Sequence, residues 1–338
     1  MKTVHRLYCR SPRRGSLLTD CRSPMMDSRP AARHPAGGGL VPVCCRLYLR
    51  WFAEKIVIFG MWMQKCRYCL ILTRPANACH ILWGMLYYRK TGSGPPVILV
   101  HGLLGSCANM GELARGLSRR FEVLAVDLRN HGRSFHAPDM KYSRMAQDLA
   151  GFMDEMKLET AGMVGHSMGG KCAMQLAMDF PDRTAGLVVL DMAPRAYEPI
   201  WKGFVQTMLD MDLTSVTRRD QADRLLAETV PDQAFRGFLL QNLKRGDDGR
   251  FLWRANLSAI LTAMPEISAP ISGRPYPGPA LFVRGGASDF VADSDWEEIQ
   301  ILFPAAELKT IARTGHLIHL EHPDLLTGLL TDFFVKSF

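Results

Sequence analysis

Ser167 is the residue whose surroundings most directly suggest covalent chemistry. It lies in Gly165-His166-Ser167-Met168-Gly169-Gly170, between the apolar run Ala161–Val164 and a helical pattern, Lys171–Phe180, that Pro181 ends. In the order strand, G-x-S-x-G, helix, the serine occupies a sharp turn that projects its hydroxyl for nucleophilic attack. A plain glycine-rich turn is the alternative, but it would not require a strand and a helix on its two sides.

A serine hydroxyl is a weak nucleophile unless a base accepts its proton, and histidine is the usual base. Three of the ten histidines lie close to the C-terminus, namely His316, His319 and His322. His316 follows the strand-like run Glu307–Ala312 and comes directly after a glycine, which lets the chain turn. Since the order serine, acid, histidine is typical of this arrangement, we predict His316 as the base. His319 and His322 are expected to begin the last helix or to bind its backbone.

Two acidic residues could orient the histidine and stabilise its charged form. Asp191 ends the apolar run Gly186–Leu190, and Asp289 follows the next run, Leu281–Arg284. The commoner pattern G-x-x-D-x-x-V would place the acid where Ser288 stands, one residue before Asp289. Side chains alternate along a strand, so Asp289 is expected to point away. Both acids remain candidates at this point, with a preference for Asp191.

An oxyanion that forms during acyl transfer needs hydrogen-bond donors already in place. The usual pair is the N–H of the residue after the nucleophile and an N–H from the loop after an earlier strand. These positions correspond to Met168 and to Leu103, which follows His101-Gly102. Both are main-chain groups, so the residue types themselves carry little information.

The elements that would position these groups alternate between strands and helices. The apolar runs and helical patterns indicate an α/β fold with a mostly parallel central sheet flanked by helices. The expected strands are Val97–Val100, Phe121–Asp127, Ala161–Val164, Gly186–Leu190, Leu281–Arg284 and Glu307–Ala312, and the expected helices between the earlier ones are Met110–Arg119, Met145–Met156 and Lys171–Phe180.

Residues 195–270 are more than one crossover helix needs, and they predict a small helical cap over the site. The expected cap helices are Pro199–Met211, Arg219–Glu228, Pro231–Arg245 and Leu252–Met264. Their apolar residues could line an acyl pocket or pack as core against the sheet, because both uses give the same helical spacing. The pocket candidates are Trp201, Phe204, Met208, Phe235, Phe238 and Leu239.

Six motifs in this order resemble those of the YbfF-type esterases and their mitochondrial relatives in the α/β-hydrolase superfamily, over residues 85–338. The resemblance implies an α/β-hydrolase fold. It also implies that the acid lies in the Leu190-Asp191-Met192-Ala193-Pro194 segment, which favours Asp191. It also implies a serine near the triad at Ser288. Some relatives are assigned an acid just after the W-R-x-N-L motif, where this chain has Ser258. The motifs are His101-Gly102-Leu103-Leu104-Gly105-Ser106, Asp127-Leu128-Arg129-Asn130-His131-Gly132-Arg133-Ser134, Gly165-His166-Ser167-Met168-Gly169-Gly170-Lys171, Leu190-Asp191-Met192-Ala193-Pro194, Trp253-Arg254-Ala255-Asn256-Leu257 and Gly315-His316.

The net charge of +8 belongs to the first part of the chain. Residues 1–80 carry 14 Lys and Arg against three acidic residues, and seven of the nine cysteines. We expect residues 1–84 to be a basic leader outside the working domain, either disordered or a non-native extension, with a transit peptide as the alternative. A zinc site from Cys66, Cys69, Cys79 and His80 is not expected, because adjacent Cys79 and His80 cannot easily reach one tetrahedral metal.

These patterns predict a serine hydrolase that cleaves short to medium acyl esters or thioesters, acyl-CoA-like substrates included, through an acyl-enzyme. No cofactor, metal, nucleic acid partner or integral membrane association is expected, and the oligomeric state is left open. The expected location is cytoplasmic, or the mitochondrial matrix if the leader is a transit peptide. A haloperoxidase-like enzyme, a C–C bond hydrolase and a non-catalytic receptor remain alternatives, because fold alone does not determine function.

Overall fold

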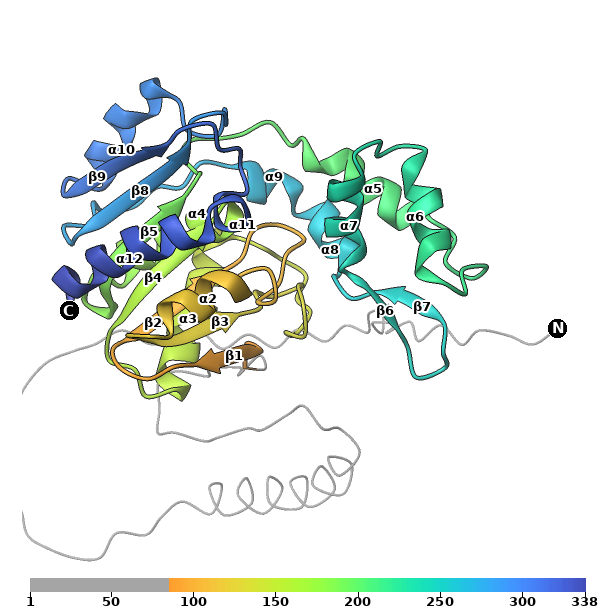
Figure 1. Cartoon of the computed structure of the whole chain (residues 1–338), viewed down its shortest axis with the longest axis horizontal. Coiled ribbons are helices and arrows are strands. Elements are labelled where there is room, and N and C mark those ends of the chain that lie inside the picture. Colours follow the sequence, from red (N-terminus) through yellow and green to blue (C-terminus); the bar gives the residue numbers. More distant parts are fainter. Residues whose placement is uncertain (1–84) are drawn as a thin grey trace, which may run out of the picture. The chain divides into compact units, whose positions relative to one another are not determined.

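A computed structural model describes residues 85–338. They form a seven-stranded sheet in the order β1-β3-β2-β4-β5-β8-β9, in which every neighbouring pair is parallel except β1 with β3 (Figure 1). The predicted α/β fold with a mostly parallel sheet is confirmed. The strands are β1 (Tyr88–Thr91), β2 (Pro96–Val100), β3 (Glu122–Val126), β4 (Ala161–His166), β5 (Thr184–Leu190), β8 (Ala280–Gly285) and β9 (Ala306–Ile311).

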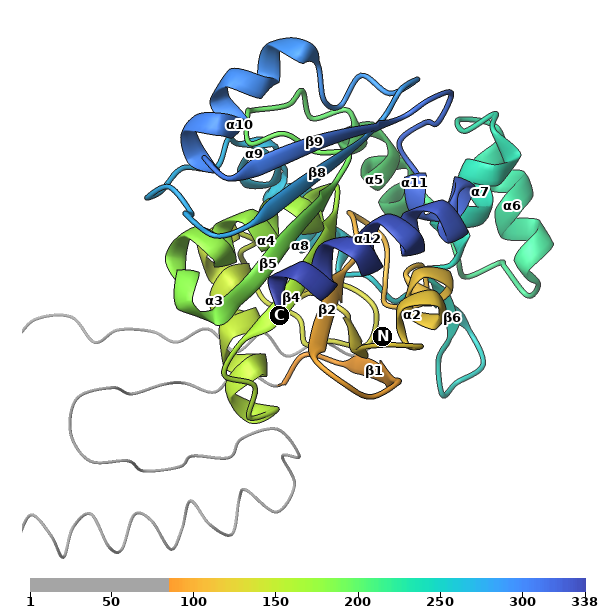
Figure 2. The same cartoon turned by 60° about the vertical axis from the view of Figure 1, so that its left-hand side comes forward.

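Helices cover both faces of the sheet, which is why the central strands are continuous apolar runs. On one face, Leu99 of β2 packs with apolar residues of α2 and α12; on the other, Ile98 packs with those of α3 and α4. Figure 2 shows α12 lying across the first face and α3 with α4 on the second. The helices outside the cap are α2 (Gly111–Leu117), α3 (Tyr142–Glu155), α4 (Met168–Asp179), α10 (Trp296–Leu302), α11 (Ile318–Glu321) and α12 (Pro323–Ser337).

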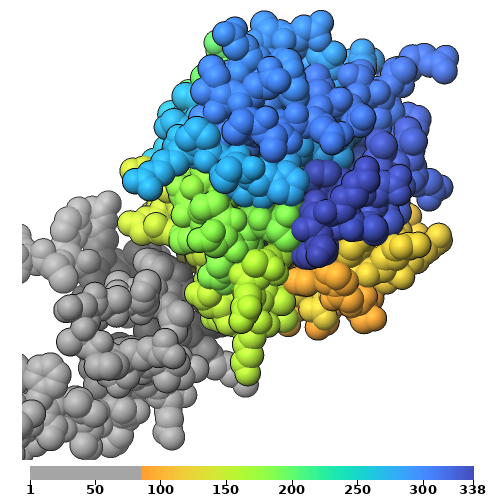
Figure 3. Space-filling model, turned by 90° about the vertical axis from the view of Figure 1, so that its left-hand side faces the viewer, coloured from red at the N-terminus to blue at the C-terminus, as the bar shows by residue number. Residues whose placement is uncertain are grey.

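The C-terminal helix α12 and the early helix α2 are far apart in sequence but lie side by side. Figure 3 shows α12, in dark blue, packed beside the early part of the domain, in orange and yellow, on one continuous surface. Phe334 of α12 is fully buried and contacts the Phe121 ring edge-on, with ring centroids 5.9 Å apart. The C-terminal helix therefore shares a hydrophobic core with α2 and Phe121.

The chain between β5 and β8 forms the cap, which lies at one end of the sheet in Figure 1. Its entry and exit are paired: the Tyr197 N–H donates to the Ser268 carbonyl and the Ile271 N–H to the Pro194 carbonyl, both at 2.9 Å. The cap elements are α5 (Trp201–Asp210), α6 (Arg219–Ala227), α7 (Gln233–Leu240), β6 (Leu243–Arg245), β7 (Phe251–Trp253), α8 (Leu257–Thr262) and α9 (Met264–Ser268).

Two cap predictions were wrong in part. The helix predicted over Pro231–Arg245 ends at Leu240, and the helix predicted from Leu252 begins only at Leu257. The intervening residues form the β6–β7 hairpin, whose turn contains Gly249 at a φ of +79°. The Asn256 side chain then accepts from the Ala259 N–H and caps α8, which fixes the start of that helix.

The predictions for the leader and for Cys66, Cys69, Cys79 and His80 lie outside the described residues. Within residues 85–338, no helix has both the length and the apolar character needed to cross a bilayer.

Candidate active site

Ser167 lies in the turn between β4 and α4 with a φ of +54° and a ψ of −122°. Non-glycine residues rarely adopt this conformation, and it persists only where the surroundings enforce it. The glycines on both sides supply the space: a Cβ on Gly165 would collide with the Gly169 carbonyl, and one on Gly169 with the His101 carbonyl. The predicted strand-turn-helix context of the serine is therefore present.

Asp191 follows β5 and is fully buried, and three donors converge on its carboxylate. His316 donates from Nδ1 to Oδ2 at 2.7 Å, and the Gly285 N–H donates to Oδ1 at 2.9 Å. The Ser288 hydroxyl also donates to Oδ2. A buried carboxylate with this many donors is held in one orientation and stabilises positive charge on the imidazole.

His316 lies on the loop after β9, with its ring fixed between aromatic neighbours. The Phe290 ring stacks on it with centroids 3.7 Å apart, and the His166 ring lies 4.7 Å away on centroids. Because Nδ1 donates to Asp191, Nε2 carries the lone pair. Nε2 is buried and has no hydrogen-bond partner among the described residues. It is thus available to a group in the adjoining cavity, which Ser167 and His316 line together.

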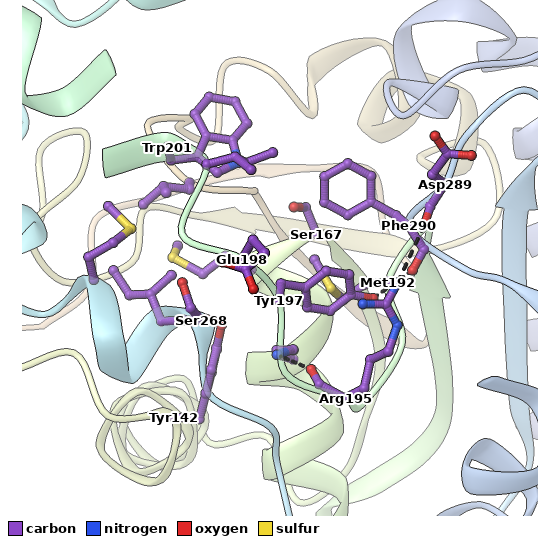
Figure 4. A pocket seen from close by; sticks show the side chains of 16 residues that line it. Tyr142, Ser167, Met192, Arg195, Tyr197, Glu198, Trp201, Ser268, Asp289 and Phe290 are labelled. Carbon is purple, nitrogen blue, oxygen red and sulfur yellow. Dashed lines mark hydrogen bonds between the residues drawn. The ribbon is translucent and has the colours of Figure 1, made fainter. Parts of the chain in front are cut away.

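Asp289 is not brought to the histidine. Figure 4 shows its carboxylate on the far side of the Phe290 side chain from Ser167. Its backbone carbonyl accepts from Arg195 Nη2 at 3.4 Å. Ser288 and Asp289 lie beyond the end of β8 at Gly285, so strand alternation does not explain this placement, and Ser288, at the preceding position, is the residue that contacts Asp191.

Leu103 and Met168 both line the cavity at Ser167. As the first residue of α4, Met168 has an N–H without an intrahelical acceptor. The loop that carries Leu103 is braced by two histidines that the sequence analysis did not assign. His131 Nε2 accepts from the Leu104 N–H at 3.1 Å, and His101 Nε2 accepts from the Leu128 N–H at 3.0 Å.

Both bracing histidines are neutral, which their hydrogen bonds require. Each donates from Nδ1 to a carbonyl, His101 to Gly102 at 2.7 Å and His131 to Arg129 at 2.9 Å, and so accepts only at Nε2. Burial lowers the pKa of His131 to about 3 and also lowers the pKa of His101. The Leu103 loop is therefore held by neutral imidazoles over a wide pH range.

His166 and His319 also lie close to His316. His166 donates from Nε2 to the His316 carbonyl at 2.9 Å, and burial lowers its pKa well below the usual value. His319 lies in the short helix α11 and not at the start of the last helix, and it lines the cavity, where burial lowers its pKa to about 4. His322 precedes α12 and is exposed.

The cavity has two lobes that meet at Ser167, Leu103, Ile200, Trp201 and Phe290. The lobe lined by Met168, Met192 and Met264, called the methionine lobe, has a volume of about 380 Å³. The lobe lined by Phe204, Phe235 and Phe238, called the aromatic lobe, has a volume of about 320 Å³. Of the predicted pocket residues, the four aromatic ones line the aromatic lobe, whereas Met208 and Leu239 belong to the buried core. The methionine lobe, drawn in Figure 4, is lined among others by Tyr142, Met168, Lys171, Met192, Met264 and Ile267, and the aromatic lobe by Phe204, Phe235, Phe238, His316, Leu317 and Leu320.

Lys171 is a buried amine that lines the methionine lobe. Its ammonium donates to the carbonyls of Arg195 at 2.7 Å and Ala269 at 2.6 Å, one at each end of the cap. It also lies 4.8 Å from the centre of the Tyr197 ring. Burial, with the nearby charge of Arg195, lowers the pKa of Lys171 to about 7.

Comparisons with known proteins agree with this geometry. Residues 95–323 match the family described as alpha/beta hydrolase fold. The chain belongs to the α/β-hydrolase family. The mouse sn-1-specific diacylglycerol lipase ABHD11 is 38% identical over 248 residues, covering 71% of this chain and 80% of the relative. Esterase YbfF of Escherichia coli is 35% identical over 234 residues, covering 68% and 89%.

A solved marine microorganism esterase superposes with a TM-score of 0.72 at 36% identity, over 74% of this chain and 99% of the esterase. The predicted resemblance to YbfF-type esterases is confirmed. This α/β-hydrolase is an enzyme of the ester-hydrolase class, as its esterase and lipase relatives show. Its substrates are small-molecule esters.

Proposed function

We propose that the chain hydrolyses acyl esters through an acyl-enzyme, with Ser167 as nucleophile, His316 as general base and Asp191 as the acid that orients it. The observation that carries this proposal is the buried Asp191–His316 hydrogen bond, which leaves Nε2 of His316 unpartnered beside the cavity at Ser167. No hydrogen bond joins Ser167 and His316 in the described structure. Such bonds are often long without substrate and shorten in the complex.

In the first step, Ser167 Oγ attacks the ester carbonyl while His316 Nε2 takes the hydroxyl proton. The N–H groups of Leu103 and Met168 stabilise the oxyanion, and Asp191 stabilises the imidazolium. Collapse of the intermediate breaks the bond to the alcohol, which takes the proton from Nε2. Water then attacks the acyl-enzyme by the same route, releasing the acid and restoring Ser167.

The proposed substrates are short to medium acyl esters and thioesters, acyl-CoA-like substrates included. The support is the limited volume of the two lobes and the cap that covers them. Each buried methylene adds about 0.8 kcal/mol of binding until a lobe is full, so rates should rise with chain length and then fall steeply.

A panel of p-nitrophenyl esters and acyl-CoAs of graded chain length tests this proposal, with labelling by a fluorophosphonate probe alongside. We expect labelling, turnover and an optimum at short to medium length. A steady rise up to emulsified long-chain triglyceride would instead indicate a lipase. Binding without turnover would support the receptor alternative.

We also propose a cytoplasmic location, or the mitochondrial matrix if residues 1–84 act as a transit peptide. The support is that Cys107 and Cys172, the two cysteines in the described residues, are both free thiols, as in reducing compartments. Imaging of the full chain and of a chain beginning at Met85, each fused to a fluorescent protein, distinguishes the two locations.

A further inference from the structure

The two lobes differ in which part of the catalytic machinery they contact. His316 lines the aromatic lobe and not the methionine lobe. The same is true of its neighbours Leu317, His319 and Leu320. Met168, whose N–H is a proposed oxyanion donor, lines only the methionine lobe. Ser167 and Leu103 line both. A substrate held at Ser167 would thus extend in two directions, one of which passes His316.

The chemistry decides which half of an ester takes which direction. The leaving oxygen must receive its proton from His316 Nε2, so it must lie within hydrogen-bond distance of that atom. The carbonyl oxygen must at the same time lie between the N–H groups of Leu103 and Met168. With the carbonyl fixed in this way, the alcohol departs on the side of His316, and the acyl chain takes the other direction from Ser167, into the lobe that His316 does not line.

We infer that the aromatic lobe binds the leaving alcohol and the methionine lobe binds the acyl chain, so that the enzyme takes esters whose alcohol is apolar. This inference rests on the proposed function and narrows its substrate class: acyl-CoA-like substrates, whose leaving group is charged, fall outside it. It also changes the sequence-based hypothesis, in which the cap aromatics formed an acyl pocket.

The composition of the aromatic lobe fits an apolar alcohol. Trp201, Phe204, Phe235 and Phe238 form one cluster, in which the Phe204 and Phe235 rings meet edge-on at 4.9 Å between centroids. No Asp, Glu, Lys or Arg lines this lobe within the described chain. The charged residues at the cavity, Lys171, Arg195, Glu198 and Asp289, all line the methionine lobe. A charged alcohol would find no ionic partner beside His316.

Isomeric esters separate the two halves of the substrate. Hexyl acetate and ethyl hexanoate have the same atoms, with the long chain on the alcohol or on the acid. In a series of acetate esters, lengthening the alcohol should raise kcat/KM by about fourfold for each methylene until the aromatic lobe is full. Phe235→Ala should lower kcat/KM for hexyl acetate at least tenfold and change that for ethyl hexanoate less than twofold.

Ile267→Ala is the matched control, because Ile267 is apolar and lines only the methionine lobe. It should lower kcat/KM for ethyl hexanoate more than for hexyl acetate. Phe235→Leu keeps most of the buried volume and should restore much of the activity on hexyl acetate, which distinguishes a lost contact from a folding defect.

Deacylation gives a second test, because the alcohol has already left when it begins. With p-nitrophenyl hexanoate, the rate constant for hydrolysis of the hexanoyl-enzyme should stay within twofold in Phe235→Ala and should fall in Ile267→Ala. A slower deacylation in Phe235→Ala, or an equal loss on both isomers, would overturn the lobe assignment while leaving ester hydrolysis intact. Absence of both probe labelling and hydrolysis in the unmodified chain would instead contradict the proposed function.

Discussion

Ser167 combines a strained backbone with a side chain that the fold does not need for packing. Its φ of +54° is enforced by the close approach of Gly165 and Gly169, so the turn is set by those glycines and not by the hydroxyl. Ser167→Ala should therefore abolish both fluorophosphonate labelling and ester turnover while leaving the thermal midpoint within a few degrees. Gel fluorescence, an ester assay and a thermal melt check this. Labelling that persists would show that another serine is the nucleophile.

The acid can be tested by comparing two substitutions of equal size. Asp191→Asn removes the acceptor that fixes the tautomer of His316, so kcat should fall by about 10⁴. Asp289→Asn changes a carboxylate that Phe290 separates from Ser167, and it should change kcat less than threefold. Steady-state kinetics on one p-nitrophenyl ester gives both values. The opposite ranking would move the acid to Asp289.

Ser288 is a positioning residue in this scheme, because it contacts Asp191 and not the reacting atoms. Ser288→Ala removes one of three donors to the carboxylate, and we expect kcat to fall about tenfold. Ser288→Thr keeps a hydroxyl and should recover most of the rate in the same kinetic assay. A Ser288→Thr variant as slow as Ser288→Ala would contradict the positioning role.

The reacting side chains could be predicted from the sequence, whereas the residues that brace them could not. Ser167 and His316 lie in short motifs whose order along the chain indicates their chemistry. His101 and His131 act through hydrogen bonds to the backbone at Leu128 and Leu104, 27 residues away along the chain in each case. No local pattern encodes such a contact, because it depends on how two loops meet after the sheet has formed.

Among the elements, the two ends of the cap are linked by one buried amine in addition to their backbone hydrogen bonds. Lys171 of α4 donates to Arg195 and Ala269 at the entry and exit of the cap, so Lys171→Met should leave two carbonyls without that donor. We expect a loss of about 1–3 kcal/mol in the free energy of unfolding at pH 9. Urea unfolding measures this loss, and hydrogen exchange should rise near residues 193–197 and 268–271.

The pH dependence of this effect has a definite sign. The pKa of Lys171 is about 7 in the folded protein, against 10.5 for an unperturbed lysine, so between these values the unfolded chain binds more protons. Stability contributed by Lys171 therefore rises with pH across this window. The difference in unfolding free energy between the unmodified chain and Lys171→Met should be about 1–2 kcal/mol larger at pH 9 than at pH 7. A smaller difference at pH 9 would mean that folding favours the charged amine.

The boundaries predicted from the sequence agree with the structure for strands that are buried on both faces. They were less accurate for the elements of the cap. Val97–Val100 and Gly186–Leu190 are apolar throughout because helices cover both sides, and each lies inside the strand observed. In residues 241–256 the short strands β6 and β7 pair only with each other. Three-residue strands are too short to show a periodicity that separates them from the end of a helix.

At the largest scale, residues 85–338 contain the seven-stranded sheet, two hydrophobic cores and both lobes of the cavity. Leu86, one residue from the start of this part, is already buried in the core. We therefore expect a chain beginning at Met85 to fold with a thermal midpoint within a few degrees of the full chain and to retain its kcat/KM. Mild proteolysis of the full chain should remove the basic leader first. Differential scanning calorimetry and ester kinetics on both chains check this, and a midpoint many degrees lower would place part of residues 1–84 within the fold.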